Sequence, residues 1–156
     1  MHLQQLAFSK IRGLNYSTGT ALVGFRTFTN FGFDAAGEKV IFARVIGKVT
    51  PVEGVDLIIA LPHKGDWERI YGWVIAENGR IVIDKDAVVS DVSLAIFSLV
   101  ASVFLIFYVS SAIAIIGATI LIVQGAIRAE AAFQWHDANT ELKKTSTRIK
   151  NEISNH

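Results

Sequence analysis

The densest group of side chains that could carry out chemistry lies in residues 62–69. This segment holds a histidine, two carboxylates, two cations and a tryptophan: His63, Asp66, Glu68, Lys64, Arg69 and Trp67. Histidine titrates near neutral pH and a neighbouring carboxylate can orient its ring, so general acid or base catalysis is the chemistry to test here. If the chain is an enzyme, this segment is therefore the one candidate for its active site.

The rest of the chain offers that segment no catalytic partner. The other histidines, His2, His136 and His156, lie at the two ends or in a polar C-terminal arm. A zinc site needs three or four donors, which His63 and the nearby carboxylates do not supply. The chain has no cysteine, which excludes disulfides, thiolate metal sites and cysteine nucleophiles. We expect no catalytic residue, metal or cofactor, and interpret 62–69 as a solvated loop or a contact loop for a partner.

Nucleotide and nucleic-acid binding are also disfavoured. The 12 glycines form neither a dinucleotide-binding nor a Walker-type loop. A net charge of +1, with cations dispersed along the chain, gives no basic face for a phosphate backbone. We therefore expect no nucleic-acid partner.

The feature that must organise the molecule is an uncharged run of 36 residues, 92–127. A bilayer's hydrocarbon core is about 30 Å thick and is crossed by about 20 helical residues. One helix over the whole run would measure roughly 54 Å, whereas two helices of 17 or 18 residues fit two short crossings. The sequence favours a hairpin turning near Tyr108–Ser111, with one long span and a buried soluble hairpin as alternatives.

Within this run the informative side chains are small or weakly polar. Small residues repeat at helical spacing and predict faces on which helices approach closely, and Gln124 is the one amide that could bond between helices. No ionisable side chain marks an ion or proton path, which disfavours a transporter. The predicted packing residues are Ser98, Ser102, Ala114, Gly117, Ala118, Gln124 and Gly125.

The first 85 residues carry strand patterns rather than helical ones. Runs rich in Val, Ile, Phe and Thr predict strands over 20–33, 39–49, 55–61, 67–76 and 80–84, separated by Gly, Pro, Asn and Asp. Asn78 and Gly79 predict a hairpin with a type I′ turn. Five short strands with tight links predict an antiparallel meander, closed as a barrel or packed as a sandwich.

The polar C-terminal arm continues the helical pattern. Trp135, Leu142 and Ile149 recur every seven residues and form a narrow apolar stripe. This stripe predicts a docking face, whether for another copy, for the membrane surface or for the chain's own β domain.

Together these patterns predict an α+β membrane protein. We expect a partly ordered segment over 1–19 and a small all-β domain over 20–85. A membrane-embedded hairpin or long helix would follow over 90–128, and an amphipathic helical tail over 129–156. Cations after the run exceed those just before it, which favours a cytoplasmic C-terminus in an inner (cytoplasmic) membrane, and residues 1–20 lack the apolar core of a signal peptide.

The function expected from this organisation is a non-enzymatic membrane subunit. It would anchor a β-rich head to a lipid bilayer and contact other membrane subunits or copies of itself, in a cellular complex or a membrane-containing virion. A pore-forming oligomer and a membrane-anchored enzyme using the 63–69 segment are the alternatives.

Overall fold

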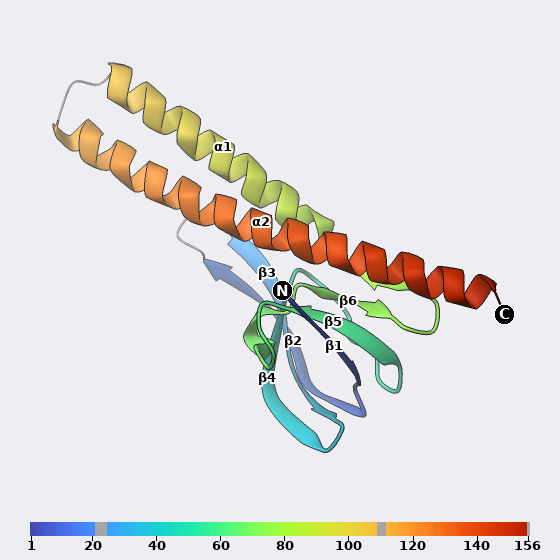
Figure 1. Ribbon diagram of the computed structural model, residues 1–156. Coiled ribbons are helices and arrows are strands. Elements are labelled where there is room, and N and C mark those ends of the chain that lie inside the picture. The colour runs from blue at the N-terminus through green and yellow to red at the C-terminus, as the bar shows by residue number, and fades with distance from the viewer. Residues whose placement is uncertain (21–24, 109–111, 156) are drawn as a thin grey trace.

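Figure 1 shows the computed structural model, which describes residues 1–20, 25–108 and 112–155, with side chains described outside 19–26, 85–91 and 108–114. Within these described ranges, seven strands and a short 3-10 helix precede two long helices. These elements are β1 (His2–Ala7), β2 (Lys10–Thr20), β3 (Phe25–Ala35), β4 (Glu38–Ile46), β5 (Asp56–Leu61), η1 (Trp67–Arg69), β6 (Gly72–Ile75), β7 (Arg80–Val82), α1 (Lys85–Tyr108) and α2 (Ala112–Ser154).

The strands form two antiparallel sheets, one of order β1-β5-β6-β7 and one of order β2-β3-β4. Their inner faces enclose an aromatic core in which the Phe8 ring lies 4.6 Å from the Phe33 ring and 6.4 Å from that of Trp73. The predicted antiparallel β domain is confirmed, and its two facing sheets match the sandwich alternative. A simple meander was wrong, because β1 pairs with β5 rather than with β2.

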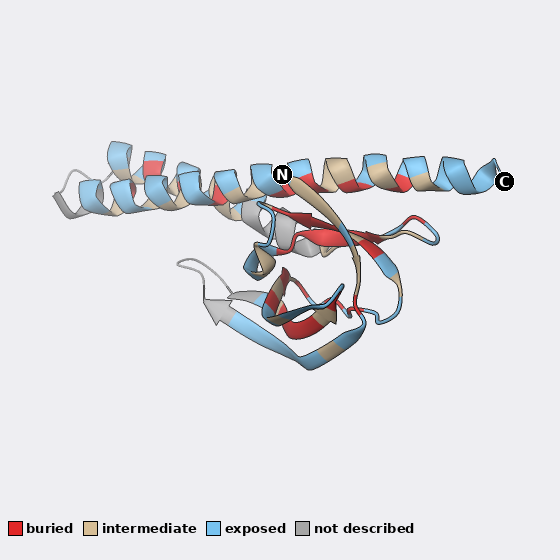
Figure 2. Ribbon diagram, turned by 60° about the horizontal axis from the view of Figure 1, so that its bottom comes forward, coloured by how far each residue is buried: buried red, intermediate tan, exposed pale blue. Residues whose placement is uncertain are grey.

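The four-stranded sheet is covered on both faces. Alternation along β5 turns Leu57, Ile59 and Leu61 towards the other sheet, while Ala60 faces the opposite way. On that opposite side Ala60 and Val74 pack against α2. The molecule therefore has three layers, with the four-stranded sheet between the three-stranded sheet and α2, and Figure 2 shows α2 lying across the β domain.

Two strands lie where the sequence predicts a partly ordered segment. β1 contains three polar side chains, His2, Gln4 and Gln5, and β2 is exposed along its described length except at Ile11. Their backbones pair with the apolar strands β5 and β3. This pairing stabilises β1 and β2 as strands, which their own side chains do little to favour. The predicted strand over 67–76 is also shorter, since Trp67–Arg69 forms η1 and packs the Trp67 ring 5.0 Å from that of Phe33.

The turn with positive φ at both central residues lies at a different hairpin from the predicted one. The hairpin at Asn78–Gly79 exists, but residues 76–79 form its loop, with Gly79 N donating to Ile75 O and only Gly79 at positive φ. The two-residue turn lies instead between β3 and β4, where Ala36 and Gly37 have φ of 49° and 83°. Positive φ at both central residues is the requirement of a type I′ turn.

The helices α1 and α2 lie side by side (Figure 1), and α2 continues without a break from the apolar run into the polar arm. The predicted turn is near Tyr108–Ser111; α1 ends at Tyr108, and residues 109–111 lie outside the described residues. Among described residues one helical segment, Ile115–Ser154, is long and apolar enough to cross a membrane, and a shorter apolar segment covers Val92–Phe107.

Candidate functional site

The small residues predicted to pack helices lie between α1 and α2. Ser98 and Ser102 of α1 and Ala118 of α2 are 3%, 1% and 2% exposed. Ser102 satisfies its hydroxyl by donating to Leu99 O at 2.7 Å. Gln124 is half-buried, and the side chain of Ala114 lies outside the described ones. The small-residue faces thus join the two helices of one chain.

Gly117 and Gly125 also face α1 but leave spare room. A methyl group on Gly125 would lie 3.6 Å from Ala95 O, and one on Gly117 would lie 3.7 Å from Leu105 Cδ1, both ordinary contacts. The close approach of the helices is therefore set by the buried serines and Ala118 rather than by these glycines.

We expect Gly125→Ala to raise the stability of the full chain by about 0.5–1 kcal/mol, because alanine loses less backbone entropy in a helix. Ala118→Leu should instead cost about 1–3 kcal/mol by overpacking the same interface. Thermal unfolding in mild detergent measures both. A lower midpoint for Gly125→Ala would mean that the helices are closer together than the structure indicates.

The outer surface of the same two helices is apolar and uncovered. The exposed fraction is 68% for Phe97, 76% for Phe107 and 66% for Ile115. Figure 2 shows exposed residues dominating both helices where they extend beyond the β domain. Only 11% of the most apolar window of α2 is buried. Within the described residues, no other part of the chain covers this surface.

The second half of α2 forms a joint with the four-stranded sheet. Trp135, Ala138 and Leu142 are buried against Ala60 and Val74, with Ile149 at the edge of the same cluster. Further along, Ser146 Oγ donates to Gly79 O at 2.5 Å. The stripe predicted as a docking face thus packs on the chain's own β domain.

The contact loop is divided between two pockets against α2. The Arg44/Arg69 pocket, of about 340 Å³, lies between β4, the end of η1 and α2, and Glu68 also lines it. His63 lines a separate pocket of about 180 Å³ with Asp137. Lys64 is exposed, while Asp66 and Trp67 are partly buried and line neither pocket. The structure therefore does not gather the predicted residues into one acid–base site, and no group of metal-binding side chains occurs in the described ranges.

Tyr71 separates these two pockets and lines both. Its hydroxyl donates to Gln134 Oε1 at 2.8 Å, and Gln134 Nε2 donates to Glu130 Oε1 at 3.2 Å. Burial raises the pKa of Tyr71; the Arg69 charge opposes this effect, whereas Asp66 and Glu130 add to it. The phenol therefore stays protonated and donating at neutral pH.

The raised pKa of Tyr71 predicts a loss of stability in alkali. Below about pH 10, the pKa of tyrosine in an unfolded chain, both states are protonated and the phenol contributes no pH dependence. As pH rises above that value, Tyr71 ionises first in the unfolded state, which lowers the free energy of unfolding. This loss continues until the pH passes the raised pKa of Tyr71 in the folded state. Urea midpoints from pH 8 to 11 should fall more steeply for the natural chain than for Tyr71→Phe. Parallel curves would contradict a raised pKa.

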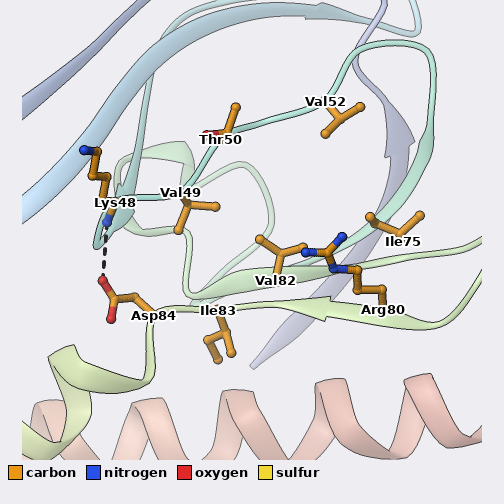
Figure 3. Close-up of a pocket in the computed structure, with 9 residues that line it drawn as sticks. All are labelled: Lys48, Val49, Thr50, Val52, Ile75, Arg80, Val82, Ile83 and Asp84. Atoms are coloured by element: carbon orange, nitrogen blue, oxygen red, sulfur yellow. Dashed lines mark hydrogen bonds between the residues drawn. The ribbon is translucent and has the colours of Figure 1, made fainter.

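A third cleft, of about 820 Å³, runs along β7, at the edge of its sheet (Figure 3). Residues 48–52 form one side and β7 the other, with Lys48 N donating to Asp84 Oδ2 at 3.3 Å. Its other charged lining residue is Arg80, and the remainder is mostly Val and Ile. The lining contains neither histidine nor cysteine, and Thr50 supplies its one hydroxyl group.

Three residues that line these pockets, Arg44, Tyr71 and Gln134, were not predicted from the sequence. They come from β4, the residue before β6 and α2, so no local motif joins them. The one available signal was an arginine on the outer face of a strand between apolar neighbours, which is too common to single out.

Comparison with protein-family models, curated proteins and solved structures finds no match for this chain.

Proposed function

We propose that this chain is a non-enzymatic integral membrane subunit, in which α1 and the first part of α2 form a transmembrane hairpin that anchors the β domain. The observation that carries the proposal is the uncovered apolar surface on both helices over the length where small residues pack them together. In water this surface would be costly, whereas in lipid it needs no partner. α1 has 24 residues and measures roughly 36 Å, enough for one crossing.

The joint between α2 and the sheet supports two crossings rather than one. Because Leu142 and Ser146 contact the β domain, the arm and the β domain must share one side of any membrane that the apolar segments enter. A single long span would separate them. Lys143, Lys144 and Arg148 in the arm favour the cytoplasmic side of an inner membrane.

The subunit role rests on which surfaces remain for partners. The docking stripe and the small-residue faces are used within the chain, so other subunits or copies would contact the outer faces of the hairpin or the exposed loops. The described outer faces carry large apolar side chains, which suit lipid or apolar helices. This composition gives no specific support to an aqueous pore.

Cysteine labelling tests the proposal cleanly because the chain has no native cysteine. Separate variants Glu77→Cys, Ser110→Cys and Thr147→Cys would be treated in sealed vesicles with a reagent that does not cross membranes. We expect positions 77 and 147 to react from one side and 110 from the other. Reaction of 77 and 147 from opposite sides would refute the hairpin, and release of the protein by alkaline carbonate would refute insertion altogether.

Native mass spectrometry in mild detergent tests the assembly separately. Oligomers or co-purified membrane subunits are expected, and a clean monomer would leave an anchored β domain without a subunit role.

A further inference from the structure

The guanidinium of Arg44, which lines the Arg44/Arg69 pocket, is held in one orientation by its neighbours. The Cζ atom of Arg44 lies 5.1 Å from the ring centroids of both Phe28 and Phe42. Arg44 Nε donates to Asn30 Oδ1 at 3.0 Å, and Asn30 Nδ2 in turn donates to Ser17 Oγ at 2.6 Å. Two rings and one amide thus fix the plane of the guanidinium, and no hydrogen bond joins its Nη atoms to another described residue.

Arg69 is held beside Arg44 by the backbone. Ile70 N donates to Arg44 O at 2.9 Å, and an isolated parallel bridge joins Val45 to Ile70. Arg69 itself is exposed and forms no ion pair within the described part of the chain. The charged residues of the lining are Arg44, Arg69 and Glu68, and Glu130, which is not part of the lining, accepts from the lining residue Gln134. A pair of guanidinium groups suits the oxygens of a phosphate, which arginine binds in a bidentate manner.

The Arg44/Arg69 pocket lies along α2 just beyond the uncharged run, where the surface of a membrane around the hairpin would be. Its α2 lining begins at Ala131 and reaches Trp135, four and eight residues beyond the end of the uncharged run at Ile127. At 1.5 Å per residue these positions lie roughly 6 and 12 Å along the helix from the apolar segment, a depth that corresponds to the lipid headgroups. Two aromatic side chains of the lining, Tyr71 and Trp135, are of the types enriched in that zone.

We propose that the Arg44/Arg69 pocket binds the phosphate of an anionic lipid headgroup. The inference rests on the proposed membrane hairpin, since that hairpin brings the pocket to headgroup depth. Arg44 supplies one fixed donor pair, and the exposed Arg69 supplies a second. The bound headgroup would link β4, η1 and α2, and so fasten the β domain to the bilayer surface as well as to the helix.

The test compares lipid retention by the natural full chain and by three variants, two of which remove one positive charge each. Arg69→Ala removes a cation that lines the pocket, and Lys64→Ala removes an exposed cation of the same loop that does not. Arg44→Lys keeps the charge but removes the planar fork. Each protein in mild detergent would be titrated with phosphatidylglycerol, with phosphatidylcholine and with inorganic phosphate, and bound species counted by native mass spectrometry.

We expect the natural chain and Lys64→Ala to retain one phosphatidylglycerol in preference to phosphatidylcholine. Arg69→Ala and Arg44→Lys should each weaken this binding by about tenfold. Equal retention by all four proteins would overturn the pocket as the site. Displacement of the lipid by inorganic phosphate at comparable concentration would overturn a lipid source in favour of a free phosphate.

Flotation with vesicles separates this inference from the proposed function. If the natural chain does not float, the membrane hairpin fails and the lipid site fails with it. If all variants float but Arg69→Ala retains as much phosphatidylglycerol as Lys64→Ala, only the lipid site is wrong.

Discussion

Leu142→Asp is expected to lower the free energy of unfolding by about 5 kcal/mol and to detach the β domain from α2. Leu142 is fully buried in the joint, against the face of the sheet formed by Ala60 and Val74. Removing a buried leucine side chain costs about 2–5 kcal/mol, and a buried carboxylate without a partner adds to that cost. The hairpin, which packs through other residues, should remain helical.

Two measurements on the detergent-solubilised chain check this. Tryptophan fluorescence should show a much lower thermal midpoint, because Trp135 reports on the same cluster. Trypsin should cut the exposed arm faster, at Lys143, Lys144 or Arg148. The matched control is Lys143→Asp, which introduces the same residue at the adjacent exposed position and should stay within about 0.5 kcal/mol of the natural chain. Similar midpoints for the two variants would contradict the joint.

The second large effect is expected at Gly47, where the turn after β4 meets the residue before α1. Gly47 has φ of 95°, and a methyl group there would lie 2.2 Å from Asp84 Cβ. An alanine would be strained by the positive φ and would also force Asp84 away, breaking its bond with Lys48 N. We expect Gly47→Ala to cost about 2–5 kcal/mol.

Gly54→Ala separates the two causes. Gly54 has φ of 72° with nothing within 4 Å of an added methyl group, so its substitution carries the backbone strain without the clash. Its cost should be about 1–2 kcal/mol. Urea unfolding of both variants gives the difference, and equal costs would mean that Asp84 does not constrain Gly47.

Sequence patterns located the elements whose own side chains determine them. The strand over 55–61 appears as β5 at Asp56–Leu61, and Asn78–Gly79 marks the β6–β7 hairpin, because a buried strand and a tight reversal leave local signatures. β1 and β2 were missed because edge strands with polar side chains depend on a distant partner for stability. The 3-10 turn at Trp67 was missed for a similar reason, since its position depends on the Phe33 ring.

The site was less predictable than the fold. The heptad spacing of Trp135, Leu142 and Ile149 correctly indicated one apolar face, but nothing local could specify that the partner would be the sheet of the same chain. Arg44 and Arg69 are 25 residues apart in sequence and meet through one backbone bond between their segments. The two arginines are brought together by the order in which β4 and η1 lie in the fold. No short sequence pattern encodes that order.

One consequence of the unbroken α2 is mechanical. Its 43 residues form a rod of roughly 65 Å, with the hairpin at one end and the β domain clasped to the other. No hinge interrupts it between Ala112 and Ser154. A change of about 10° in the tilt of the hairpin would therefore swing the last 27 residues, roughly 40 Å, through about 7 Å at the tip. If the hairpin lies in a bilayer as proposed, a change in its tilt would therefore move the β domain relative to the bilayer surface.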